Sequence, residues 1–121
     1  MVQGDLLLDR IESGDVADVE ALLAGLASDD DVEVVATALL LAEIGNGAAS
    51  AVPALTERLE RADSREVQWA CAYALGRIGG PARAAVPALM RATARLDRDV
   101  RDEASTALDR IMAEPHELVT Q

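Results

Sequence analysis

A unit of 33 or 34 residues recurs along this chain, and the recurrence restricts the fold more than any other feature of the sequence. Ala-Val-Pro-Ala-Leu stands at residues 51–55 and again at 85–89, an offset of 34 residues. Ile44, Ile78 and Ile111 continue the series at offsets of 34 and 33. A fixed period in the range of about 20–50 residues is typical of stacked arrays, in which each unit packs against its neighbours.

The apolar residues of the central unit have helical spacing. One stripe of a first helix comprises Val67, Cys71, Ala74, Leu75 and Ile78. Gly79-Gly80-Pro81 ends this helix, because glycine accepts positive φ and proline cannot continue it. A second helix follows with Pro87 in its first turn, where a missing N–H costs nothing, and with Val86, Leu89 and Met90 on its buried side. Each unit is therefore predicted to be a helical hairpin.

The pattern of the units resembles a known family. Val-x-x-x-Cys/Ala-x-x-Ala-Leu-x-x-Ile-Gly, followed by Ala-Val-Pro-Ala-Leu, is similar to the short bacterial HEAT-like repeat, a class that includes the repeats of phycobilisome-lyase-type proteins. The resemblance extends from about Leu6 to Ile111. It implies an all-α fold, an α-α superhelix (solenoid) of about three HEAT-like hairpins. Tetratricopeptide repeats share the 34-residue period but place proline near the end of the repeat, whereas here it opens the second helix.

The chain is expected to form one domain over residues 1–121. Its predicted parts are an N-terminal capping repeat (1–27), two repeats (28–63 and 64–97), a final helix (98–113) and a tail (114–121). The capping repeat is a truncated half-repeat, with a short helix at 5–12 and a helix from Asp15 to about Ala27. Further helices are expected at 32–44, from about Ser50, at 82–96 and at about 97–112. Ser28–Asp31 is interpreted as an N-cap, because the Gly and Glu that an EF-hand loop requires are missing.

The charge balance restricts the partners. The chain has 22 Asp and Glu against 11 Lys and Arg, all of them Arg, and a formal net charge of −11. Phosphate binding needs a basic footprint, so nucleic acid is not expected to be a ligand, whereas a basic protein surface is favoured. No run reaches the roughly 18 apolar residues of a membrane span, and Met1–Gly14 does not resemble a signal peptide. A cytoplasmic protein is expected, with no membrane contact.

No catalytic or metal-binding constellation is apparent. Cys71 lies within the apolar stripe, where a small buried side chain is the usual role of cysteine. His116, the single histidine, is more than forty residues away and offers no base for a nucleophile. The single Cys excludes an internal disulfide and any multi-cysteine zinc site. The sequence predicts no enzyme, no metal and no cofactor.

A second face of the first helices is the candidate binding site. In the central unit it carries the spacing i, i+4, i+8, and the 33- and 34-residue offsets give the equivalent positions in the neighbouring units. We call this set the ridge: Trp69, Tyr73, Arg77, Val35, Leu39, Glu43, Asp102, Thr106 and Arg110. The two aromatic residues could fill gaps left by small alanines or could anchor a partner, since Trp, Tyr and Arg are enriched at binding hot spots. In similar HEAT-like arrays such positions line the surface that contacts partners.

The predicted function is a non-enzymatic protein-protein interaction or scaffold module that binds another protein through the ridge. Two alternatives remain open. The family resemblance implies an accessory subunit of a chromophore or cofactor lyase, and the ridge could instead serve for homodimerisation.

Overall fold

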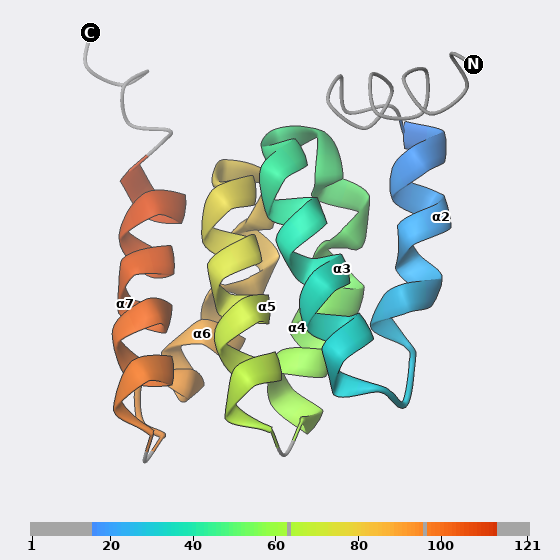
Figure 1. Ribbon diagram of the computed structural model, residues 1–121. Coiled ribbons are helices and arrows are strands. Elements are labelled where there is room, and N and C mark those ends of the chain that lie inside the picture. Colours follow the sequence, from blue (N-terminus) through green and yellow to red (C-terminus); the bar gives the residue numbers. More distant parts are fainter. Residues whose placement is uncertain (1–15, 63, 96, 114–121) are drawn as a thin grey trace, which may run out of the picture.

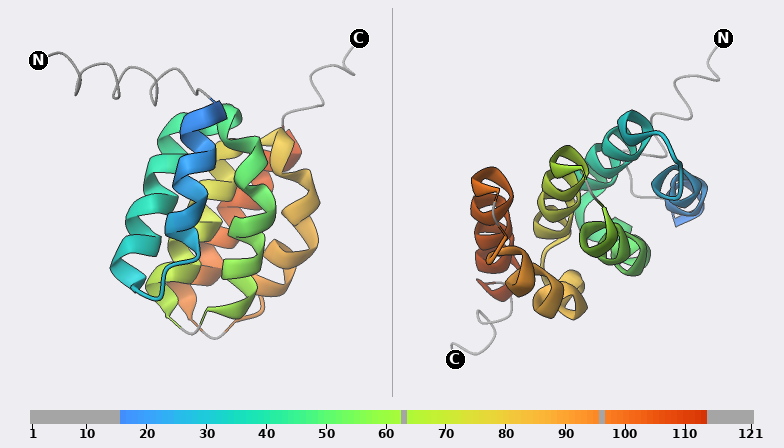
Figure 2. Two further views of the ribbon diagram at one scale, coloured as in Figure 1. Left: turned by 90° about the vertical axis from the view of Figure 1, so that its right-hand side faces the viewer. Right: turned by 90° about the horizontal axis from the view of Figure 1, so that it is seen from below.

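The computed structural model describes residues 16–62, 64–95 and 97–113, and over these residues it consists of helices without strands (Figure 1). The α-helices are α2 (Val16–Leu26), α3 (Asp31–Ile44), α4 (Val52–Arg61), α5 (Arg65–Ile78), α6 (Val86–Ala92) and α7 (Arg98–Ala113), with two 3₁₀ segments, η1 (Gly45–Ala51) and η2 (Gly80–Ala85). They form two layers, α3, α5 and α7 in one and α2, α4 and α6 in the other (Figure 2). The predicted all-α solenoid is confirmed.

The layers are held together by contacts between successive units. Within the first layer α3 packs on α5 and α5 on α7, and across the layers α4 packs on α5 and α6 on α7. The second helix of a unit thus contacts the first helix of the next unit more extensively than the first helix of its own. In each predicted hairpin a 3₁₀ segment separates the two helices along the chain, η1 between α3 and α4 and η2 between α5 and α6. The two helices of one hairpin are therefore not tightly packed on each other.

Side chains and glycines mark the helix ends. Asp30, Ser64 and Asp97 each accept a hydrogen bond from a backbone N–H in the first turn of α3, α5 and α7, at 3.0, 3.2 and 3.1 Å. These caps satisfy donors that a helix leaves unpaired at its start. Gly45 and Gly79 end α3 and α5 with φ of 70° and 80°, which only glycine adopts without strain. The N-cap interpretation of Ser28–Asp31 is confirmed.

The core lies between the layers and consists of aliphatic and small side chains. Its largest fully buried members are Leu26, Leu41, Leu55, Leu59, Leu75, Ile78, Leu89 and Ile111. Small residues let the helices approach closely. A Cβ placed on Gly25 of α2 would lie 2.2 Å from Oγ1 of Thr37 on α3, so this crossing has no room for a larger residue.

The second helices differ most from expectation. We predicted one helix at 82–96, but the chain forms η2 and then α6, which ends at Ala92. Pro87 lies in the first turn of α6, as predicted, and the residues before it make 3₁₀-type bonds, such as the 2.7 Å bond from the Ala82 N–H to the Gly79 carbonyl. The prediction that Met90 is buried is wrong, since it is 58% exposed. In this short helix Leu89 faces the core, and the next residue is turned by about 100° toward solvent.

Among the described residues, one segment, Asp31–Arg61, is long and apolar enough to cross a membrane by length and composition. It is not one rod, because Gly45 ends α3 and η1 turns the chain before α4 (Figure 1). Such segments also occur as core helices of repeat arrays, and both helices contribute buried residues here. The predicted helix at 5–12 and the tail at 114–121 lie outside the described residues.

Candidate functional site

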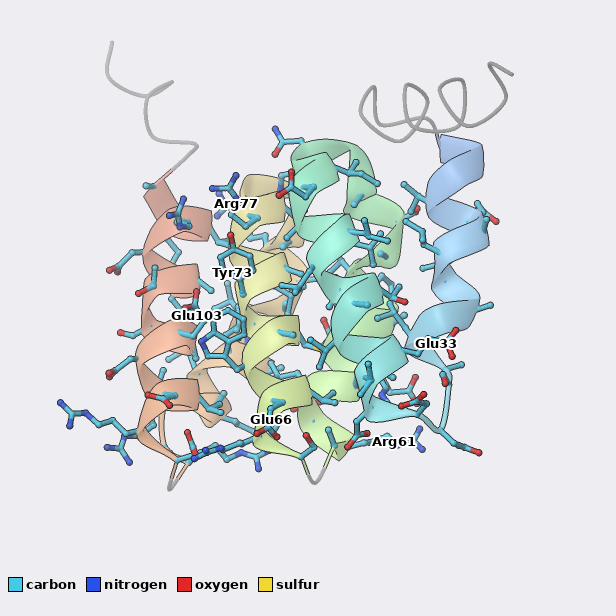
Figure 3. All side chains as sticks on the ribbon, viewed as in Figure 1. Glu33, Arg61, Glu66, Tyr73, Arg77 and Glu103 are labelled. Carbon is cyan, nitrogen blue, oxygen red and sulfur yellow. The ribbon has the colours of Figure 1, made fainter. Side chains whose placement is uncertain are left out.

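The centre of the ridge is an aromatic pair on α5. The rings of Trp69 and Tyr73 stack with centroids 5.2 Å apart and planes inclined by 5°. Both side chains are half-buried and pack against the core while remaining partly open to solvent. The rings therefore pack against the core and also form part of the surface, and their role as anchors for a partner stays a prediction. Figure 3 shows Tyr73 on the side of α5 that faces α7.

An apolar groove lies between α3 and α5. We call it the α3–α5 groove. Its volume is about 470 Å³ and its lining is Asp31, Val32, Val35, Ala36, Leu39, Ser64 and Glu66. Val32 is 75% exposed and Leu39 is 37% exposed, whereas Val35 is half-buried and packs against the core. Large aliphatic side chains exposed side by side are unusual on a monomer and mark interaction surfaces.

A second depression adjoins the groove. We call it the Trp69 pocket. Its volume is about 370 Å³ and its lining is Val35, Arg65, Glu66, Trp69, Asp97 and Asp99. Val35 and Glu66 belong to both depressions, so the two share a wall. Together they run across α3 and α5 to the start of α7.

Charged groups surround the Trp69 pocket. The Arg65 guanidinium lies 3.3 Å from Asp97 and 3.6 Å from Glu66, and its pairing with Asp97 raises the pKa of Arg65. The bond from the Val100 N–H lowers the pKa of Asp97, and a backbone N–H, with the Ser64 hydroxyl, lowers that of Glu66. Both carboxylates are therefore ionised at neutral pH. Arg65 also joins two successive units of the array.

The other ridge residues lie at the margins. Glu43 and Arg77 are exposed near the C-terminal ends of α3 and α5, and Figure 3 shows Arg77 at the end of α5 remote from Glu66. On α7 the exposed residues Asp102, Thr106 and Arg110 line neither the groove nor the pocket. Of the ridge residues, Val35, Leu39 and Trp69 thus line the two depressions. Tyr73 stacks on Trp69 but lines neither depression, and the other five ridge residues also line neither.

Glu103, which sequence reasoning did not select, faces α5 from α7 (Figure 3). Its side chain is half-buried, and burial raises the pKa of this carboxyl, although nearby Arg110 opposes the shift. Glu103 follows Asp102 by one residue, so the helical rotation of about 100° turns it toward the interhelical space. The ridge prediction selected Asp102, which is exposed, and did not include Glu103.

Several lining residues were also missed. They are Asp31, Val32, Ala36, Ser64, Arg65, Glu66, Asp97 and Asp99. One signal was available, because Val32 falls outside the repeat register: Glu33, not Val32, aligns with Val67. A valine outside the buried stripe is a candidate for the surface. The charged residues lie in the first turns of α3, α5 and α7 or just before them, whereas the ridge was defined only from positions farther along these helices.

Catalytic chemistry finds no support at Cys71. The side chain is fully buried, and burial raises the pKa of its thiol to about 12, so the reactive thiolate is scarce at neutral pH. Among the residues that the structure describes, no group of three or more His, Cys, Asp or Glu side chains is placed to hold a metal ion.

The arrangement of the helices defines an α-solenoid. Residues 19–109 match the family model for HEAT repeats. This match covers most of the chain, which therefore belongs to the HEAT repeat family. No curated protein and no solved structure gives a significant match. HEAT repeats generally mediate protein-protein interaction, and the family is typically a non-enzymatic scaffold.

Proposed function

We propose that this chain is a non-enzymatic protein-binding module that docks a basic partner protein on the α3–α5 groove and the Trp69 pocket. The observation that carries the proposal is the exposure of Val32 and Leu39 beside the Trp69–Tyr73 pair. Full burial of an exposed aliphatic side chain is worth about 1.5–3 kcal/mol, and Val32, at 75% exposure, has more surface left to bury than Leu39. Trp and Tyr are enriched among the few residues that carry most of the energy of an interface. The net charge of −11 favours a basic partner.

The alternatives have weaker support. Homodimerisation would bring two copies of an acidic face together, and like charges across an interface are unfavourable. No feature of the described residues favours a chromophore-lyase subunit over a protein-binding module. The proposed location is the cytoplasm, where a free thiol such as Cys71 stays reduced.

The test compares two charge-introducing variants. Leu39→Glu places a carboxylate in the groove, whereas Met90→Glu places one at a 58% exposed position of α6, in the other layer. The full-length wild type and both variants are immobilised and incubated with the same cell lysate. The proteins that each chain captures are quantified by mass spectrometry. We expect a set of proteins that Met90→Glu retains and Leu39→Glu loses. Equal capture by all three chains, with unchanged helicity, would contradict the proposal.

A third variant, Trp69→Ala, tests whether Trp69 anchors the partner. If Trp69 is an anchor, its removal weakens binding of a captured partner by at least about 2 kcal/mol, or roughly thirtyfold. Far-UV circular dichroism of the variant separates this result from unfolding, which would show that Trp69 acts only in the core.

A further inference from the structure

The two adjoining depressions differ in chemistry. The α3–α5 groove has an aliphatic lining of Val32, Val35, Ala36 and Leu39, with carboxylates at its rim. The Trp69 pocket combines an indole with charged groups. Because they share a wall, one ligand segment can fill both with side chains that neighbour each other on one of its faces.

The charges of this surface are unbalanced. The residues lining the groove and the pocket carry four carboxylates, on Asp31, Glu66, Asp97 and Asp99, against the single guanidinium of Arg65. Among the described residues Asp99 forms no ion pair and is exposed. A cationic group that enters the pocket would therefore meet a carboxylate without an existing partner. An acidic or phosphate-bearing ligand would meet repulsion instead.

Arg65 shows that the pocket accommodates a guanidinium. Its Nη1 lies 3.3 Å from Oδ2 of Asp97 and its Nε lies 3.6 Å from Oε2 of Glu66. Both distances exceed those of close charge-assisted hydrogen bonds, about 2.7–2.9 Å, and the Arg65 side chain is 63% exposed. The ion pairs of Arg65 are therefore weak. A cation from a ligand can share the two carboxylates with Arg65, or displace Arg65 from them, at a small cost in free energy.

Trp69 supplies the remaining wall. One face of its indole is held by Tyr73 at 5.2 Å, and Trp69 also lines the pocket, so the ring is fixed by packing before a ligand arrives. An ammonium or guanidinium over an indole is attracted by the ring quadrupole, and tryptophan is the strongest aromatic partner for such cations. The carboxylates and the indole thus favour the same kind of ligand group.

From these observations we propose that the docked element is an amphipathic segment of another protein, with one large aliphatic side chain in the α3–α5 groove and the next Arg or Lys side chain on the same face in the Trp69 pocket. In a helical segment the two side chains stand three or four positions apart. This inference rests on the proposed function and adds which side chains the partner segment presents and how far apart they stand along it. A second copy of the chain, an acidic segment or nucleic acid would not satisfy it.

The experiment screens displayed random peptides of about 16 residues, a length that spans a helix-in-groove site. The target is the immobilised full-length chain. Selected peptides are synthesised, and their affinity is measured by fluorescence anisotropy against wild type and variants. We expect enrichment of peptides with a large aliphatic residue and an Arg or Lys three or four positions before or after it. Replacing that cation by Gln should weaken binding about tenfold.

A matched pair of variants tests where the charge acts. Asp99→Lys and Asp109→Lys change the net charge equally, but Asp99 lines the Trp69 pocket and the exposed Asp109 does not. We expect Asp99→Lys to weaken the selected peptides about tenfold and Asp109→Lys to change affinity less than about twofold. Equal effects of the two variants would show that only the overall charge matters and would overturn the proposed cation site.

The outcomes separate the two proposals. If Leu39→Glu abolishes binding of the selected peptides but these peptides show no excess of Arg or Lys, the chemistry inferred for the ligand is wrong and the docking function stands. If no selected peptide is affected by Leu39→Glu, the proposed function and this inference both fail. Met90→Glu should leave every affinity unchanged.

Discussion

Gly76 of α5 lies against Ala107 of α7 so closely that a Cβ placed on Gly76 would come within 2.9 Å of both Cα and Cβ of Ala107. This contact fixes the distance between two helices of the first layer. The Trp69 pocket lies between the same helices, toward their N-terminal ends. The close contact of α5 with α7 and the pocket thus lie at opposite ends of the same helix pair.

Gly76→Ala should destabilise the fold. The new methyl group would overlap backbone atoms, and overpacking of this kind costs about 1–3 kcal/mol, while alanine regains about 1 kcal/mol of helix propensity over glycine. We expect a net loss of up to roughly 2 kcal/mol in the free energy of unfolding, measured by urea denaturation. Gly47→Ala is the control, because Gly47 is exposed in η1 and does not have positive φ. A Gly76→Ala chain as stable as wild type would show that α7 moves away freely.

Gln68 joins the end of α4 to α5. Its side chain is 7% exposed, and Nε2 donates a 2.8 Å hydrogen bond to the Ala62 carbonyl. Gln68→Met retains the volume but removes the donor, so the carbonyl loses its partner in a partly buried site. We expect a loss of about 1–3 kcal/mol in unfolding free energy. No change in the urea midpoint would mean that water replaces the amide.

Cys71 should be chemically silent in the folded protein. Burial raises the pKa of its thiol to about 12, because a thiolate among apolar side chains is poorly solvated. At pH 8 we expect no reaction with a disulfide reagent in buffer and full reaction in denaturant, followed by absorbance. Rapid labelling of the native chain would show that the α4–α5 contact opens frequently.

Glu103→Gln should stabilise the protein at pH 7. Burial raises the pKa of the Glu103 carboxyl in the folded state, so folding favours the protonated form. The stability that the carboxyl contributes is therefore present below its unfolded pKa of about 4.3 and is lost as pH rises through the folded value. The gain from Glu103→Gln should shrink as the pH of thermal unfolding is lowered below that range. Asp109→Asn, at an exposed position, is the control, and a gain that does not depend on pH would contradict this assignment.

Much of the fold could be predicted because its determinants are local and periodic. The repeat offset placed Pro87 in a first turn, and Gly79 ended α5 where the pattern required it. Met90 was misplaced because the buried stripe of this segment, Ala85, Ala88, Leu89 and Ala92, consists mostly of alanines. A pattern that gives weight to large apolar side chains selects Val86, Leu89 and Met90 instead.

The candidate site was less predictable, since it is formed by side chains of three helices. Trp69 and Leu39 were identified from their spacing, whereas Asp99 was not considered, although the 33-residue offset pairs it with Glu66, which lines the same pocket. Thr106 was included by analogy with Tyr73, and yet it lines neither depression. Equivalent positions in a repeat share a helix face, whereas the depth of a pocket depends on side-chain size and on the neighbouring unit.

The central claim is that the face carrying Trp69 is open in the free chain and is covered by a partner. Acrylamide quenching of Trp69, the single tryptophan, tests it most directly across a dilution series and with a saturating peptide whose binding depends on Leu39. The account predicts quenching at every concentration of the free chain and a marked decrease with the peptide, which Leu39→Glu abolishes. Protection of Trp69 in the dilute free chain, or quenching that the bound peptide leaves unchanged, would contradict it.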